Sequence, residues 1–199
     1  MKQSKKQPER TRQAMMAAAG AEFALRGYAG SGLGAIVARA EMTKGALFHH
    51  FSDKRKLAEA WIREALTMAI GEIWIQPLER IDSLQAMQGF FRVRCQHLQP
   101  GDATSALAAL TAELAATDPT LGLALEEIFA TWRRSLGELL ERGQSEGWIH
   151  RGIQPPVESA FLVSVCVGFS VTTHGHLDGQ SRRACATAVE GYLETLRAQ

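Results

Sequence analysis

Apolar residues recur at every third or fourth position along most of the chain, which is the spacing of one buried face of an α-helix. Two short patterns of this kind follow each other within residues 31–54. The first places four apolar side chains on one face, Leu33, Ile36, Val37 and Ala40. Helices of this length are unstable alone, so we expect the two to pack together as a helix, a tight turn and a second helix.

Capping residues and an apolar pair define the two short helices. Ser31 is the expected N-cap of the first helix. Thr43 can cap the second through its hydroxyl, and Leu47 and Phe51 form the i, i+4 pair that packs it against the first.

The side chains left over on the second helix are cationic, small or aromatic. They are Lys44, Gly45, Ala46, Phe48, His49 and His50, with Lys54 just beyond the helix. A small N-terminal edge allows close approach to a DNA duplex, a lysine can reach a base edge or a phosphate, and a helix N-terminus favours phosphate oxygens. The alternative is a corner between two helices of an ordinary helical domain, with these side chains merely solvated.

A continuous stretch of roughly 50 residues resembles the N-terminal domain of the TetR family of transcriptional regulators. The residues that carry the resemblance are Arg12, Met15-Met16, Ala18-Ala19, Phe23, Gly27-Tyr28, Ile36, Ala40, the run from Thr43 to Phe51, and Lys54 to Leu57. The resemblance implies a three-helix DNA-binding head at 8–68, with its helix-turn-helix at about 31–50. It also implies a helical effector-binding and dimerisation body at 69–199.

The same resemblance implies a function. Such a protein is a homodimer, more often a repressor than an activator, that binds the half-sites of a palindromic operator about one helical turn apart, roughly 34–36 Å. A small-molecule effector bound in the body releases it from double-stranded DNA. The residues expected to contact DNA are Ser31, Thr43, Lys44, Gly45, Ala46, Phe48, His49, His50 and Lys54. An effector-independent DNA-binding module is the alternative within this class.

Three residues depart from the pattern of the family. Gly32 stands where Ser or Thr is frequent, which removes one side-chain contact to a phosphate. Glu41 replaces a frequent glycine in the turn, where a positive φ is less well tolerated by a residue with a side chain. Glu22 replaces an apolar residue, and we expect its carboxylate to reach water at the edge of the core.

Charge is divided unevenly along the chain. Residues 1–63 hold twelve Lys or Arg and five Asp or Glu, whereas residues 64–199 hold ten and sixteen, although the whole chain carries +1. A basic head on an acidic body is expected if only the head meets the phosphate backbone.

The rest of the chain continues the helical pattern. The first helix is expected to end at Gly27, a residue that tolerates the left-handed conformation. Later helices are expected at about 53–77, 82–98, 105–116, 118–147, 156–174 and 180–197, with caps at Asp53, Asp82-Ser83 and Asp118 for the first, second and fourth of these. No strand or hairpin signal interrupts them, so the predicted fold is all-α, with a helical bundle after the head.

Small residues line one face of each of the last two helices. They are Ala160, Ser164, Gly168 and Thr172 on the first, and Ala184 and Ala188 on the second. This pattern favours a homodimer interface in which the two helices meet their symmetry mates, and tight packing within one chain is the alternative.

An effector pocket is expected in the body between Phe91, Cys95, Trp132, Phe161, Val165 and Phe169, although apolar residues at helical spacing are more often core. No phosphate loop or nucleophile motif points to an enzyme or a cofactor, so a helical enzyme is the remote alternative. The spacing of His174 and His176 does not place both on one helical face, and no metal site is expected. The three cysteines form no close pair and are expected to be small buried side chains. No apolar run approaches the ~20 residues of a membrane span, so we expect a cytoplasmic protein without a membrane partner.

Overall fold

The computed structural model describes residues 6–99, 101–172 and 179–198. Within these ranges the chain is helical, and the β-type pairing consists of one isolated bridge between Ile149 and Arg197. The predicted all-α fold is therefore confirmed. His174 and His176 lie outside the described residues.

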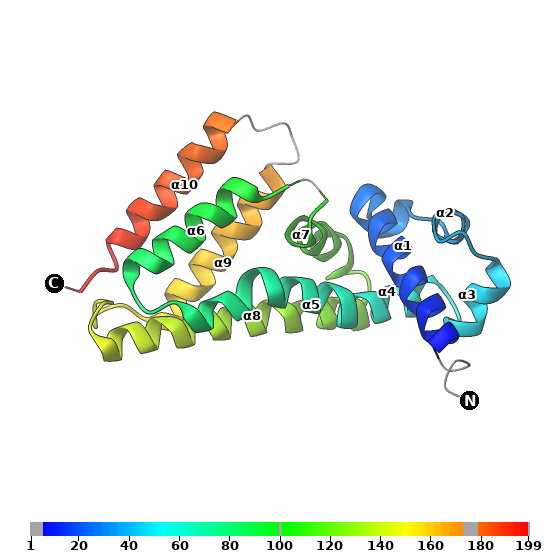
Figure 1. Ribbon diagram of the computed structural model, residues 1–199, viewed down its shortest axis with the longest axis horizontal. Helices are drawn as coiled ribbons and strands as arrows, with labels where there is room; N and C mark the ends of the chain where they lie inside the picture. Colours follow the sequence, from blue (N-terminus) through cyan, green and yellow to red (C-terminus); the bar gives the residue numbers. More distant parts are fainter. Residues whose placement is uncertain (1–5, 100, 173–178, 199) are drawn as a thin grey trace. The chain divides into compact units, whose positions relative to one another are not determined.

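The helices follow each other in the order drawn in Figure 1. The first four are α1 (Lys6–Gly30), α2 (Leu33–Arg39), α3 (Lys44–His50) and α4 (Lys54–Trp61). The later ones are α5 (Thr67–Ile70), α6 (Leu84–His97), α7 (Ala103–Leu114), α8 (Pro119–Glu146), α9 (Pro155–Thr172) and α10 (Gly179–Glu194). Three predicted caps are confirmed, because Thr43, Asp53 and Ser83 each accept the backbone N–H three residues further on.

The chain divides into two compact units. One runs up to Ala69 and includes Ala109–Glu126, and the other consists of Ile70–Ala108 and the chain from Glu127 onward. The segment Ala109–Glu126 contains the end of α7 and the start of α8. Each of these two helices is therefore divided, with one part in the first unit and the other part in the second. The domains expected from the sequence, 8–68 and 69–199, place this segment with the body instead.

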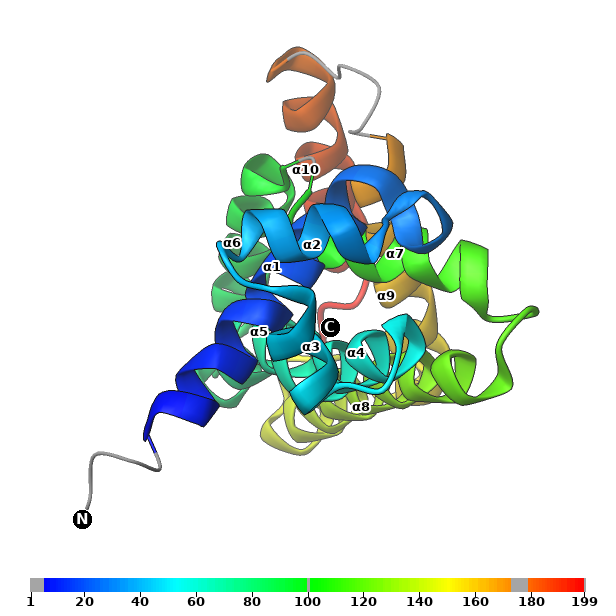
Figure 2. The same cartoon turned by 90° about the vertical axis from the view of Figure 1, so that its right-hand side faces the viewer.

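Helices α1, α2, α3 and α4 pack around the core of the first unit, and Figure 2 shows how these helices are arranged. The most deeply buried side chains of this core include Met15, Phe23, Ile36, Leu47 and Leu57. Gly20 lets the indole of Trp61 lie directly on α1, because a Cβ at this position would stand 2.3 Å from Trp61 Nε1. Gly27 has the expected left-handed backbone conformation, with φ 70°, where the chain turns at the end of α1.

The long helix expected at about 53–77 changes its hydrogen-bonding pattern along its length. Its helical path continues from Lys54 to Arg80 through two π-helical turns, Ile62–Leu66 and Gly71–Ile75, and a final 3-10 turn, Gln76–Arg80. The Thr67 hydroxyl donates to the carbonyl oxygen of Ile62, five residues earlier, at 2.9 Å. A hydroxyl that donates to a backbone carbonyl in this way competes with the backbone N–H groups that form the regular hydrogen bonds of an α-helix. Apolar spacing alone does not reveal such turns.

An aromatic cluster fills the core of the second unit. Trp74 lies against Trp132 with ring centroids 4.7 Å apart, and Phe91 lies 6.3 Å from Trp74. The indole N–H of Trp74 donates to Thr104 Oγ1 at 2.8 Å. This bond satisfies the polar atom of a fully buried indole, so the ring can be packed like an apolar side chain.

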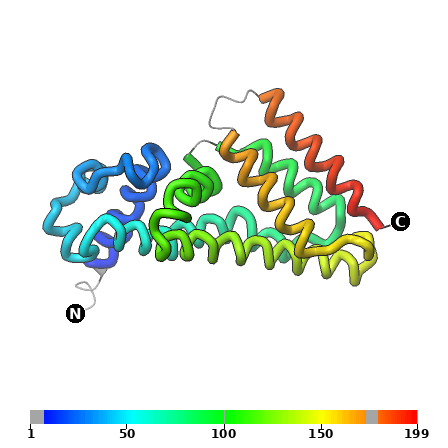
Figure 3. Tube along the Cα trace, turned by 180° about the vertical axis from the view of Figure 1, so that it is seen from behind, coloured from blue at the N-terminus to red at the C-terminus, as the bar shows by residue number. Residues whose placement is uncertain are grey.

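Helices α6 and α10 lie side by side and run antiparallel, as Figures 1 and 3 show. Gln88 Nε2 donates to Glu194 Oε2 at 2.9 Å, and Arg92 forms an ion pair with Glu190 at 3.0 Å. These contacts fix the register of the two helices within the second unit.

All three cysteines are free thiols. Cys95 and Cys166 are buried, as expected, and Cys185 is partly exposed. Burial raises the pKa of the Cys95 thiol to about 11 and the pKa of Cys166 well above its usual range.

Candidate nucleic-acid interface

The turn between α2 and α3 depends on an uncommon backbone conformation. Glu41 has φ 53°, and within the described part of the chain every other positive φ belongs to a glycine. The backbone N–H of Met42 donates to the Val37 carbonyl at 3.1 Å and closes the turn. The positive φ expected at this position is confirmed, and the side chain of Glu41 is held there at some cost in conformational energy.

A cap and two buried side chains orient α3. Thr43 Oγ1 accepts the N–H of Ala46 at 3.1 Å, which satisfies one free donor of the first turn. Leu47 and Phe51 are buried in the core of the first unit. The predicted apolar pair therefore anchors one side of α3 and leaves the opposite side facing outward.

The outward side of α3 carries the residues predicted to contact DNA. Lys44, Gly45, Phe48 and His49 are exposed, and Phe48 has 52% of its surface accessible. Ala46 and His50 are half-buried, and the ring centroids of His49 and His50 lie 5.1 Å apart. The structure thus brings these six side chains onto one helix, with a lysine and a small residue at its N-terminal edge.

Ser31 differs from its prediction. It is 1% exposed, and its hydroxyl donates to the carbonyl oxygen of Gly27 at 2.6 Å. The N-cap position of α2 is Gly32, which supplies no side-chain bond. The Ser31 hydroxyl is used to close the end of α1, so the prediction that it caps α2 was wrong, and it offers no free hydroxyl to a phosphate.

Lys54 is also held inside the head. Its Nζ donates to the Ser31 carbonyl at 2.7 Å and lies 4.3 Å from the centroid of the Tyr28 ring. Burial lowers the pKa of Lys54. This lysine therefore stabilises the junction between α1 and α4, a use that its position beyond the recognition helix did not indicate.

A pair of charges missed by the sequence interpretation links α1 to α2. Glu22 is 3% exposed, and Arg39 donates from Nε to Glu22 Oε1 at 2.8 Å. Arg26 lies 3.4 Å from the other oxygen of the same carboxylate. The expectation that Glu22 reaches water was wrong, because two arginines cover it. The feature of the sequence that could have indicated this ion pair is Arg39, an arginine on the outer side of a short helix.

A family profile matches the region that contains this interface. The family described as "Bacterial regulatory proteins, tetR family" matches residues 15–61, from the first helix to the end of α4. Residues 15–61 thus carry the DNA-binding domain of the TetR family, and the findings support a TetR-type transcriptional regulator. Proteins of this kind regulate transcription and bind DNA, and they are not enzymes.

Similar proteins match most of the length of this chain. It is 25% identical over 150 residues to the "HTH-type transcriptional repressor DhaR" of Mycobacterium sp. (strain GP1), and the match covers 71% of each chain. A TetR-family regulator structure from Cytophaga hutchinsonii has a TM-score of 0.83 at 15% identity, with full coverage of both chains. A TetR regulator from Chloroflexus aurantiacus J-10-FL has a TM-score of 0.82 at 20% identity, covering 98% of this chain and all of the other. These two structures share the fold.

The residues expected at a dimer interface lie on the outer faces of α9 and α10. Ser164, Gly168, Thr172, Ala184 and Ala188 are exposed, and Ala160 is half-buried. Large apolar side chains stand beside them on α9, with Val157, Phe161 and Val171 each at least 45% exposed. A single chain thus leaves an apolar face with small residues uncovered.

Helix α9 is also the one described segment that is long and apolar enough, by length and composition alone, to cross a membrane. The expectation that no segment approaches this length was wrong for Pro155–Thr172, because its single charged residue is Glu158 and its other polar residues are three serines and a threonine. About 33% of it is buried in the single chain. The criterion does not distinguish a membrane span from a helix of a folded bundle.

The residues expected to line an effector pocket are only partly brought together. Phe91, Cys95, Trp132 and Phe169 are buried, and Val165 is half-buried. Phe161 is 45% exposed and packs on Tyr192 of α10, with ring centroids 4.6 Å apart. Its placement with the interior residues was wrong, because it lies on the outer face of α9.

Proposed function

We propose that this TetR-family regulator acts as a homodimeric repressor in the cytoplasm, holding a palindromic operator with one α3 helix in each of two adjacent major grooves. The observation that carries the proposal is the outward side of α3, where Lys44 and small or aromatic residues stand free of the protein's own core. A helix with this composition can approach a duplex closely.

Different residues of α3 have different proposed roles. Lys44, His49 and Ala46 face base edges, because they lie on the exposed or half-exposed side of the helix. Thr43, Gly45, Phe48 and His50 contact the sugar-phosphate backbone and fix the register of the helix. Helix α3 is basic and has no acidic residue in its first turn.

The uncovered face of α9 and α10 supports the proposed dimer. Exposed Val157, Phe161 and Val171 would be removed from water by a second copy, and Gly168 and Ala188 would let helices approach closely. A two-fold arrangement uses the same face of both copies and closes on itself, which a palindromic operator requires.

A small-molecule effector is proposed to bind among the apolar residues of the second unit. Phe91, Trp132 and Phe169 provide an aromatic interior suited to an apolar or aromatic molecule, with Cys95 and Val165 beside them. Binding would favour an arrangement of the two heads that does not fit the operator, which lowers DNA affinity.

The test begins with selection of duplexes from a random library by the purified protein. The expected result is an inverted repeat whose half-sites lie about one helical turn apart, bound with an affinity that falls steeply with salt. Light scattering coupled to gel filtration should give twice the chain mass for the free protein. Recovery of no preferred duplex, or a monomer that binds the palindrome with full affinity, would overturn the corresponding part of the proposal.

A further inference from the structure

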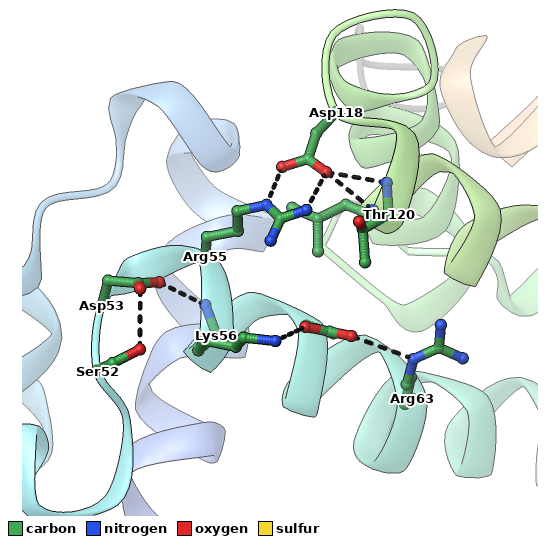
Figure 4. Close-up of polar contacts among 9 residues, drawn as sticks. Ser52, Asp53, Arg55, Lys56, Arg63, Asp118 and Thr120 are labelled. Carbon is green, nitrogen blue, oxygen red and sulfur yellow. Dashed lines mark hydrogen bonds and ion pairs between the residues drawn. The ribbon is translucent and has the colours of Figure 1, made fainter.

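Asp118 connects two segments of the first unit that are 63 residues apart in sequence. Arg55 of α4 donates to its carboxylate through two nitrogens, with Nε 2.5 Å from Oδ2 and NH2 3.0 Å from Oδ1 (Figure 4). A two-point contact between planar groups fixes direction as well as distance. The start of α4 is therefore held in a defined orientation to the start of α8.

The same carboxylate also caps α8. Asp118 Oδ1 accepts the backbone N–H groups of Thr120 and Leu121, each at 3.1 Å. Its position is therefore set by the helix that it begins, and Arg55 is held by an acceptor that is already fixed. A side chain held in this way can orient its partner, whereas a freely rotating carboxylate could not.

Glu113, at the end of α7, makes a second connection. It accepts the backbone N–H of Tyr28 at 2.7 Å through Oε2 and the N–H of Ala29 through Oε1. The left-handed φ of Gly27 turns these two amides toward the carboxylate, and a Cβ at Gly27 would stand 2.9 Å from Glu113 Oε2. The backbone amides at the end of α1 are thus bound by a side chain at the end of α7.

Lys54 joins the two connections to each other. It immediately precedes Arg55 in the sequence. Its Nζ donates to the Ser31 carbonyl and lies over the ring of Tyr28. The end of α1 and the start of α4 therefore form one structure around the α2–α3 segment, and two carboxylates from Ala109–Glu126 hold that structure.

We propose that Asp118 and Glu113 are positioning residues for DNA binding, which hold α1 and α4, and through them α3, on the ends of α7 and α8. This inference rests on the proposed function, because it concerns two heads on one operator. Helices α7 and α8 both continue into the second unit. By holding the head on the ends of these helices, the two carboxylates limit the range of half-site spacings that a dimer can bind.

The experiment compares Asp118→Asn and Glu113→Gln, singly and together, with the wild type and with Glu59→Gln. Asparagine preserves the cap of α8 but not the charged two-point contact with Arg55. Glu59 serves as the matched control, because its ion pairs are with Lys56 of α4 and with Arg63 in the turn that follows α4. Far-UV circular dichroism verifies that each variant is folded.

Two readouts are taken. The first is the dissociation constant for the selected duplex with two base pairs added between its half-sites, divided by the dissociation constant for the duplex that the wild type selects. The double variant should lower this ratio by about fivefold or more, the size of an ordinary coupling between sites, while Glu59→Gln should leave it within about twofold. The second is hydrogen exchange of the Tyr28 and Ala29 amides, which should accelerate in Glu113→Gln.

The possible failures can be told apart. If the wild type selects no duplex, the proposed function fails and the positioning role fails with it. If the wild type selects a palindrome but the double variant keeps its spacing ratio, the positioning role alone is overturned. Unchanged exchange at Tyr28 and Ala29 in a folded Glu113→Gln would also overturn it.

Discussion

The Nε of Arg39 lies 2.8 Å from a carboxylate oxygen of Glu22, which joins α2 to α1 across the edge of a buried core. Arg39→Ala should lower the free energy of unfolding by about 1–3 kcal/mol, because it removes the closer of the two arginine partners of a buried carboxylate. Glu22→Leu should cost less, since an apolar residue can replace a buried ion pair at little net cost.

Urea denaturation measures both effects. Lys56→Ala is the control, because its ion pair with Glu59 is a surface pair within one helix, worth about 0–1 kcal/mol. Equal losses of unfolding free energy in Arg39→Ala and Glu22→Leu would contradict the claim that a buried Glu22 carboxylate without Arg39 is costly.

Lys44 and Lys54 should separate DNA contact from head stability. Lys44→Ala should lower operator affinity and reduce the salt dependence by about one unit of slope, because one phosphate or base contact is lost. Its melting temperature should not change, since Lys44 is exposed. Lys54→Ala should lower the free energy of unfolding by about 1 kcal/mol, because the bond to Ser31 and the contact with the Tyr28 ring are lost.

Fluorescence anisotropy with a labelled duplex at several salt concentrations gives the slopes, and thermal unfolding gives the stabilities. An unchanged affinity of Lys44→Ala would remove this lysine from the interface.

Gly168 offers a direct test of the dimer surface. A Cβ at Gly168 would meet no other atom within 4 Å in a single chain, so a side chain is accommodated within the protomer. A partner helix packed against this position would be displaced. Gly168→Leu should therefore shift the protein from dimer to monomer without changing its helix content, and Gly168→Ala should have a smaller effect.

Analytical ultracentrifugation over a range of concentrations measures this shift, and circular dichroism measures the helix content. A dimer as tight as that of the wild type in Gly168→Leu would exclude this face from the interface.

Acid should weaken the first unit through Asp118. Its hydrogen bonds with Arg55 lower its pKa to about 2, whereas an unfolded aspartate titrates near about 4. The stabilisation from the ionised carboxylate is therefore complete above about pH 4 and is lost as the pH falls toward 2. Asp118→Asn should show a smaller loss of stability over this interval than the wild type, and the two should differ by a constant amount between pH 5 and 8.

Urea midpoints at a series of pH values give the comparison. If the two proteins lose stability in parallel below pH 4, then Asp118 does not contribute to the acid response.

Thiol labelling should distinguish the three cysteines. Burial disfavours the thiolates of Cys95 and Cys166, so both should resist a maleimide at pH 7.5 in the folded protein. Cys185 is partly exposed and should react first. Mass spectrometry of the labelled peptides identifies the site, and rapid labelling of Cys166 would show that the α9 region opens readily.

Features set by neighbouring residues were predicted well from the sequence. Thr43, Asp53 and Ser83 cap helices because a short polar side chain before an apolar pattern satisfies a free N–H close to it. The positive φ of Glu41 follows from the need for a sharp turn between two short helices. The outward side of α3 was identified once Leu47 and Phe51 had been assigned to the core.

Features that depend on distant residues could not be predicted. Asp118 was recognised as a helix cap, but nothing near it indicates that Arg55 is its partner. Glu113 binds backbone amides 84 and 85 residues away, and backbone amides leave no mark in a sequence. Ser31 was assigned to the wrong helix because a serine between two helices can serve either one.

The dependence of the head on Ala109–Glu126 limits how it can be transplanted. A fragment cut after residue 68 would retain every side chain of α2 and α3, yet Arg55 and the amides of Tyr28 and Ala29 would lose their carboxylates. A chimaera that joins this DNA-binding head to another protein therefore also needs the separate segment Ala109–Glu126, which supplies Glu113 and Asp118.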